Sequence, residues 1–96
     1  MKDTQREILE WVERTFGPVT TSERALMLAE ETGEVCRCVV KTQQGVRPST
    51  RSNLPDELAD VGIVLLCFAE YVGIDLETEI KRRFEEAQQR EYERDE

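Results

Sequence analysis

Five carboxylates in two short segments are the residues best suited to chemistry in this chain of 96 residues. Glu30, Glu31 and Glu34 lie in the first segment, and Glu57 and Asp60 lie in the second. Side chains three or four positions apart lie on one face of a helix. If both segments are helical and face each other, their oxygens can surround a hard divalent cation. The spacing therefore predicts a carboxylate metal site between two helices.

The alternative is an ordinary solvated or ion-paired acidic surface. The chain has 21 acidic residues, and a single pair of acids at helical spacing is weak evidence. Two otherwise apolar rows favour the metal site: Leu28, Glu31, Val35 and Cys38, and Glu57, Asp60, Val64 and Cys67. An acid in an apolar row must be protonated, paired or metal-bound, because isolated buried charge is costly. Spacing and context alone leave both interpretations open.

Composition narrows the class of protein. The net charge of −8, from 13 basic and 21 acidic residues, argues against nucleic acid or an anionic membrane as a partner. The polar N-terminal residues lead us to expect no signal peptide, and the longest apolar run, residues 61–69, is too short to span a bilayer. Three cysteines without any histidine disfavour a zinc site. We expect reduced, buried cysteines in a cytoplasmic protein.

Apolar periodicity predicts four helices near residues 3–16, 20–43, 53–72 and 76–92, with no strand pattern. Thr20 and Glu23 match a capping box at the start of the second helix, and Gly17 and Gly73 end the first and third helices. Residues 42–53 form a loop. The sequence therefore predicts one all-α domain over residues 1–96.

The third predicted helix is apolar nearly all round. Leu58, Leu65 and Phe68 belong to one apolar row, and Ile63 and Leu66 add a second. Such a helix is buried on several sides, which a chain of this length cannot achieve alone. We therefore expect an obligate homo-oligomer, either a homodimer or a dimer of dimers (a tetramer).

The two acidic segments also carry a family resemblance. The first reads E-E-x-x-E within Leu28–Val35, and the second reads E-x-x-D within Pro55–Val61. Together, in this order, they resemble the signature of the MazG-like, all-alpha nucleoside triphosphate pyrophosphatases. Residues 57–66 and 72–76 are similar to that family's third helix and its exit, and the resemblance covers roughly residues 20–90. It implies a four-helix MazG-like bundle completed by oligomerisation.

The resemblance implies an activity and a set of roles. The expected reaction is Mg²⁺-dependent hydrolysis of (deoxy)nucleoside triphosphates to monophosphate and pyrophosphate, in nucleotide-pool house-cleaning, with Mn²⁺ as a substitute metal. By motif match, the metal ligands are Glu31, Glu34, Glu57 and Asp60. Glu30 is either a further ligand or the base that orients the attacking water.

Substrate contacts are expected from one aromatic residue and several basic side chains. Trp11 either packs in a core or interface or forms a wall of the nucleobase pocket. Three basic side chains are either solvated or in contact with the triphosphate: Lys41, Arg47 and Arg51. The family pattern K-x-x-x-N-x-x-R matches Arg83, Ala87 and Arg90, so its Asn is missing here. Alternatively, Arg83 and Arg90 only pair with Glu86 or Glu93.

Other kinds of chemistry find no support in the sequence. Histidine is absent and the cysteines lie in apolar rows, so a covalent nucleophile with a base partner is not indicated. The sequence also lacks a Gly-rich phosphate loop that ends in Lys-Ser/Thr. A di-iron bundle with Glu-x-x-His pairs is disfavoured for the same lack of histidine. A non-catalytic helical interaction module and a phosphoribosyl-ATP pyrophosphohydrolase of the same superfamily remain as alternatives.

Overall fold

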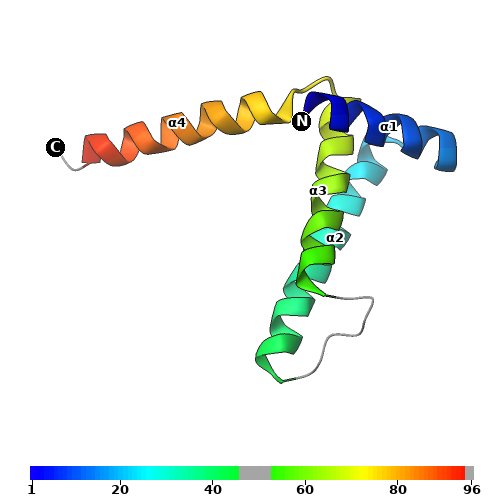
Figure 1. Cartoon of the computed structure of the whole chain (residues 1–96), viewed down its shortest axis with the longest axis horizontal. Coiled ribbons are helices and arrows are strands. Elements are labelled where there is room, and N and C mark those ends of the chain that lie inside the picture. Colours follow the sequence, from blue (N-terminus) through cyan, green and yellow to red (C-terminus); the bar gives the residue numbers. More distant parts are fainter. Residues whose placement is uncertain (46–52, 95–96) are drawn as a thin grey trace.

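The computed structural model describes residues 1–45 and 53–94, which form helices and turns and contain no strand. The helices are α1 (Lys2–Phe16), α2 (Thr21–Gln43), α3 (Leu54–Tyr71) and α4 (Leu76–Arg94) (Figure 1). The predicted all-α class is confirmed, and each predicted helix boundary lies within two residues of the observed one.

Local capping fixes the starts of the two helices that carry the acids. Thr20 Oγ1 accepts a hydrogen bond from the Glu23 backbone N–H at 3.1 Å and donates to Glu23 Oε1 at 3.0 Å. Asn53 Oδ1 accepts from the Asp56 backbone N–H at 2.9 Å, and Pro55 lies in the first turn of α3. Each cap satisfies a backbone donor that the first helical turn leaves free. The predicted start of the second helix at a Thr20 cap is therefore confirmed.

Glycines end α1 and α3. Gly17 and Gly73 have positive φ angles of 79° and 76°, a region of backbone conformation that glycine enters without steric cost. The chain leaves each helix at these residues and turns toward the next one. Both glycines were predicted as helix ends, and both predictions are confirmed.

Three helices pack together. α2 and α3 lie side by side and run antiparallel, and α1 crosses the end of α3 that leads into α4 (Figure 1). The buried apolar residues of the described chain are few: Val12, Cys38, Cys67 and Ala69. Cys36 is exposed, so the prediction that all three cysteines are buried is wrong for this one. Residues two positions apart point to nearly opposite sides of a helix, so Cys36 faces away from the side of α2 that buries Cys38.

Gln5 fastens α1 to the turn between α3 and α4. Its side chain is fully buried. Gln5 Nε2 donates to the Ile74 carbonyl at 2.8 Å and to Glu70 Oε2 at 3.2 Å, and Gln5 Oε1 accepts from the Leu76 backbone N–H at 2.9 Å. The amide thus joins the end of α3, the turn and the first residue of α4, and it fixes their positions relative to α1.

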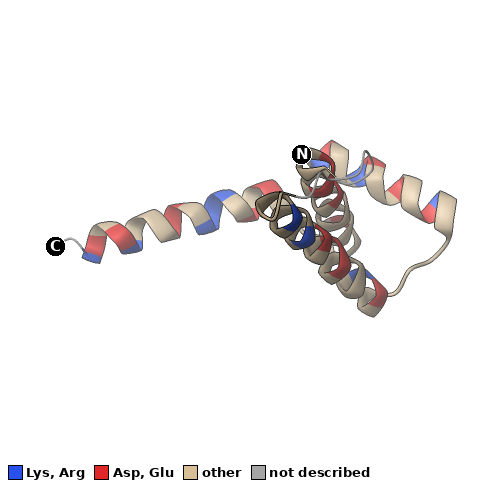
Figure 2. Cartoon of the chain, turned by 90° about the horizontal axis from the view of Figure 1, so that it is seen from below, with Lys and Arg blue, Asp and Glu red and all other residues tan. Residues whose placement is uncertain are grey.

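α4 extends away from the other three helices (Figure 1). It contains no buried residue, and acids alternate with bases along its length (Figure 2). Apolar side chains on it, including Ile80 and Phe84, are exposed. One chain therefore packs α1, α2 and α3, and completion of a four-helix bundle by oligomerisation remains a prediction. In the described part of the chain, none of the helices combines the length and apolar character needed to cross a membrane.

Candidate functional site

The antiparallel pairing of α2 and α3 brings three of the predicted acids together. One carboxylate oxygen from each of Glu31, Glu57 and Asp60 lies within 4.8 Å of the others. Glu57 is buried, with 6% of its surface exposed, Glu31 is half-buried and Asp60 is exposed. The cluster is therefore buried at Glu57 and open to solvent at Asp60. A ligand would enter from the open side.

Helical geometry accounts for this arrangement. Glu57 and Asp60 are three positions apart on α3 and share one face. Glu57 lies in the first turn of α3, four residues after the Asn53 cap. The helix dipole favours negative charge at this end, which offsets part of the cost of burying the carboxylate. Glu31 meets this face from the middle of α2.

The acids act on one another electrostatically. Burial raises the pKa of the Glu31 carboxyl above its usual value, and the charges of Asp60, Glu57, Glu34 and Glu30 raise it further, in that order. Within residues 1–45 and 53–94, no ion pair with a base neutralises Glu31, Glu57 or Asp60. A cluster of like charges of this kind is costly without a cation.

This donor set fits a hard divalent cation. Carboxylate oxygens are the ligands that Mg²⁺ and Mn²⁺ prefer, whereas zinc and copper sites rely on thiolate or imidazole. The deciding observation is Glu57, an almost fully buried acid that has no basic partner in the described chain. Metal ions commonly satisfy buried acids of this kind.

Two further predicted acids lie at the edge of the cluster. Glu34 is not among the three that share the short oxygen distances, and its Oε1 pairs with Arg37 Nη1 at 3.1 Å. Exposed pairs of this kind contribute only about 0.3–0.5 kcal/mol, so releasing Glu34 costs little. Glu30 is exposed and close enough to raise the pKa of Glu31. Ligation by Glu34 and the role of Glu30 remain predictions.

An apolar cavity of about 140 Å³ lies between α1, α2 and α3. It begins one turn from the acids, at Met27 and Ile63, and the aromatic rings of Trp11 and Phe16 line it. These two rings meet edge to face, with centroids 5.6 Å apart and an angle of 81° between their planes. Trp11 is 49% exposed, so it is a wall of this cavity rather than a core residue.

The predicted substrate-binding basic residues that the structure describes lie away from the acidic cluster of the same chain. Lys41 is exposed ten residues beyond Glu31, which corresponds to about 15 Å along α2. Arg83 pairs with Glu86 at 2.8 Å, as the solvated alternative predicted, and Arg90 is exposed on α4. Ala87, at the position of the family's Asn, is exposed on α4 as well. Arg47 and Arg51 lie outside the described residues.

Sequence reasoning missed Arg24. This residue of α2 is only 3% exposed, and its Nη1 donates to Cys67 Sγ at 3.2 Å. Its guanidinium carbon lies 4.0 Å from the centre of the Tyr71 ring. The available signal was spacing: Arg24 precedes Glu31 by seven residues, or about two helical turns, and therefore lies on the same face of α2.

Comparison with known proteins identifies the family. Neither a curated protein nor a solved structure matches the chain. The family model described as the MazG nucleotide pyrophosphohydrolase domain matches residues 20–94, which include both acidic segments and α2, α3 and α4. This match confirms the resemblance inferred from the two motifs, and the family implies nucleotide pyrophosphohydrolase activity and metal dependence in general. Since the match spans well over half of its length, the chain belongs to the MazG nucleotide pyrophosphohydrolase domain family.

Proposed function

We propose that this protein hydrolyses (deoxy)nucleoside triphosphates to the monophosphate and pyrophosphate with Mg²⁺, as a cytoplasmic house-cleaning enzyme of the nucleotide pool. The observation that carries the proposal is the convergence of Glu31, Glu57 and Asp60 within 4.8 Å, inside the region that matches the family model. An open, uncompensated carboxylate cluster is suited to holding a cation against a polyphosphate.

Each acid has a role in this scheme. Glu31, Glu57 and Asp60 hold the cation, and Glu34 joins them when it leaves Arg37. A bound cation supplies charge neutralisation at the phosphates and lowers the pKa of a nearby water. The exposed Glu30 accepts the proton of a water whose oxygen bonds to the α-phosphorus. The bond from this phosphorus to the oxygen that bridges to the β-phosphate breaks, and pyrophosphate leaves.

The apolar cavity beside the acids is proposed to take the nucleobase. Its aromatic walls, Trp11 and Phe16, suit the flat face of a base. Lys41, Arg47 and Arg51 are proposed to contact triphosphate oxygens. Arg83 and Arg90 lie on α4, which extends away from the other three helices of its chain. We therefore propose that they contact the substrate in the site of a second subunit.

We further propose that the chain works as a homodimer or a dimer of dimers. Apolar side chains exposed on α3 and α4 support this proposal: Leu58, Ile63, Leu65, Ile80 and Phe84. A groove of about 250 Å³ adds further uncovered apolar surface, and its lining includes Leu28, Phe68 and Val72. Apolar surface on this scale is typical of protein interfaces.

Pyrophosphate release tests the proposed function. We expect release from several triphosphates in Mg²⁺, and its loss in Asp60→Asn, because an amide is a poor ligand for a hard dication. The panel should contain all NTPs and dNTPs, oxidised and methylated forms, and phosphoribosyl-ATP. No release from any of them, together with no Mg²⁺ or Mn²⁺ binding in calorimetry, would favour the non-catalytic interaction module.

A further inference from the structure

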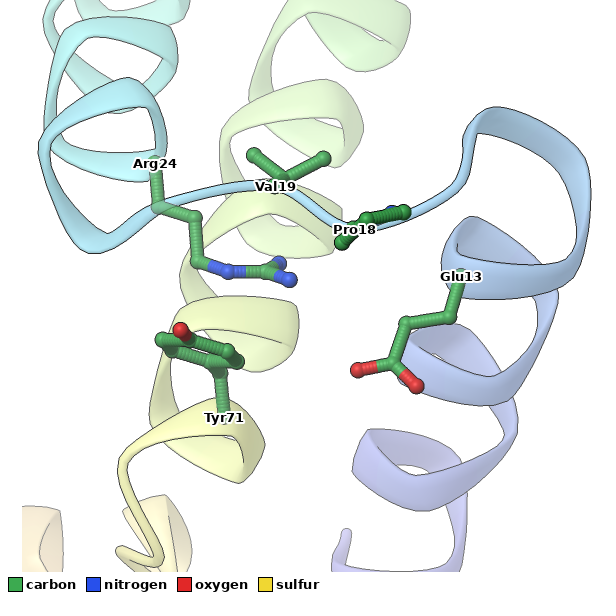
Figure 3. Close-up of a pocket in the computed structure, with 5 residues that line it drawn as sticks. All are labelled: Glu13, Pro18, Val19, Arg24 and Tyr71. Atoms are coloured by element: carbon green, nitrogen blue, oxygen red, sulfur yellow. The ribbon is translucent and has the colours of Figure 1, made fainter.

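A second cavity lies two helical turns from the acidic cluster, at the other end of the contact between α2 and α3. Its volume is about 350 Å³, and its lining residues come from α1, α2, α3 and the turn between α1 and α2 (Figure 3): Glu13, Pro18, Val19, Arg24 and Tyr71. Sites for small molecules usually measure about 300–1,000 Å³. The space is therefore large enough for part of a substrate.

The donor in this cavity is Arg24, a buried cation with two nitrogens that lack acceptors in the described part of the chain. Nε and Nη2 of Arg24 are buried, and neither has a hydrogen-bond partner among the described residues. Its Nη1 donates to the sulfur of Cys67, which is a weak acceptor. A buried guanidinium that is neither paired nor fully hydrogen-bonded is costly. Arg24 is therefore suited to a ligand that brings an acceptor into the cavity.

The acceptor in this cavity is Glu13. Its carboxylate reaches in from α1, opposite the Arg24 guanidinium, which lies over the Tyr71 ring (Figure 3). No ion pair joins Glu13 to Arg24, so the space between them separates the two charges. Arginine can only donate hydrogen bonds, and an ionised glutamate can only accept them. A matching ligand presents an acceptor toward Arg24 and a donor toward Glu13.

This cavity also adjoins the proposed nucleobase site. Arg24 lines both cavities, the one with Trp11 and Phe16 and the one with Glu13. Arg24 precedes Glu31 by about two turns, or about 10 Å along α2. An extended nucleotide with its phosphates at the acids therefore brings the edge of its base to Arg24.

Building on the proposed function, we infer that Arg24 and Glu13 select nucleotides whose base has a carbonyl next to a ring N–H. Guanine, hypoxanthine, uracil and thymine have this edge, with the carbonyl facing Arg24 and the N–H facing Glu13. Adenine and cytosine have the reverse edge, an amino donor beside a bare ring nitrogen. In that orientation they would turn a donor toward Arg24 and an acceptor toward Glu13. Nε and Nη2 of the buried Arg24 would then stay without an acceptor, and a site built for hydrogen bonding rejects such ligands strongly.

Two pairs of substrates isolate this edge. dITP differs from dATP, and dUTP from dCTP, only by the exchange of the amino group for a carbonyl with its ring N–H. We expect kcat/KM for pyrophosphate release to favour dITP and dUTP by about ten- to a hundredfold, the discrimination of one good two-point contact. Glu13→Gln should collapse both ratios to about one to threefold, because an amide both donates and accepts.

Glu10→Gln is the matched control. Glu10 is an exposed acid one turn earlier on α1 and does not line the cavity, so this variant should keep both ratios of the parent. Pyrophosphate release at equal rates within each pair, or a preference that Glu13→Gln leaves intact, would overturn the selection of bases alone. No pyrophosphate from any triphosphate would overturn the proposed function and the base selection with it.

Discussion

Glu57 is the residue on which the acidic cluster depends most. Only 6% of its surface is exposed, it lies in the first turn of α3, and it lies beside two other carboxylates. The helix dipole at the start of α3 and the open side of the cluster offset part of the cost of burying this residue. The same features give a bound cation a strong effect on the stability of the fold.

Removing one charge from this cluster should have opposite effects with and without metal. In EDTA, Asp60→Asn should melt at or above the temperature of the parent, because one like-charge repulsion is gone. Mg²⁺ at about 100 times its dissociation constant should stabilise the parent by about 2.7 kcal/mol and the variant far less. Differential scanning calorimetry measures both quantities.

The control for this comparison is Glu93→Gln. Glu93 lies on α4, away from the cluster, and its substitution should change neither quantity by much. Equal stabilisation of the parent and Asp60→Asn by Mg²⁺ would contradict the metal site.

The raised pKa of Glu31 predicts a dependence of stability on pH. Folding makes this carboxyl harder to ionise than in the unfolded chain, where its pKa is near 4.5, so the folded state binds more protons above that pH. In EDTA, the free energy of unfolding of the parent should therefore fall relative to that of Glu31→Gln as pH rises from about 4.5 through the raised pKa. Urea unfolding of both proteins at several pH values measures this difference.

The exposed acids Glu77 and Glu86 do not disturb this comparison. Hydrogen bonds from Lys81 and Arg83, respectively, lower their pKa values, and both pairs are present in parent and variant alike. Their contributions therefore cancel in the difference. A difference in unfolding free energy that stays constant from pH 4 to pH 8 would show that Glu31 is not in the predicted environment.

At the scale of single elements, the helix boundaries could be predicted because their causes are local. Thr20, Asn53 and Gly73 act on residues within one turn of themselves. The face that Glu57 and Asp60 share could be predicted for the same reason, whereas the approach of Glu31 depends on the packing of α2 against α3. Arg24 could not, because its burial depends on Cys67 and on other residues more than 40 positions away in the sequence.

The direction of α4 could not be predicted from the sequence either. It depends on Gln5, a polar residue on α1 whose partners Glu70, Ile74 and Leu76 lie more than 60 residues further along the chain. Nothing in the local pattern around Gln5 distinguishes it from a solvated glutamine. Contacts of this kind emerge only when the elements are placed in space.

Gln5→Ala should destabilise the fold by about 1–3 kcal/mol. The substitution leaves the Leu76 N–H and the Ile74 carbonyl without their partner, and an unsatisfied buried polar group costs about that much. Urea unfolding measures the loss. Gln43→Ala, at an exposed position of α2, is the control and should stay within about 0.5 kcal/mol of the parent. Equal stability of both variants would mean that the Gln5 contacts do not hold the turn.

At the scale of the whole molecule, the small core is the main feature. Few apolar residues are buried in the described chain, whereas many large ones are exposed on α3 and α4. A domain of this size has little interior to spare. Association between chains would move this surface out of water, which is why we propose an oligomer.

Phe84→Glu should weaken the proposed oligomer. Phe84 is 59% exposed on α4, and burying its ring in an interface would stabilise association by about 1.5–3 kcal/mol, which a charge cannot replace. Multi-angle light scattering at micromolar concentration should show a dimer or tetramer for the parent and a shift toward monomer for the variant. Glu91→Gln on the same helix is the control. A parent that is monomeric and fully folded would contradict the proposed assembly.

The Gln5 contacts also have a mechanical consequence. The turn that they hold is a pivot, and α4 is a lever of 19 residues, or about 28 Å, that begins at it. If α1, which carries Trp11 and Glu13, shifts while these hydrogen bonds hold, the turn and the start of α4 shift with it. A rotation of about 10° at the pivot moves the far end of α4 by about 5 Å. The tip of α4 therefore magnifies small displacements of α1.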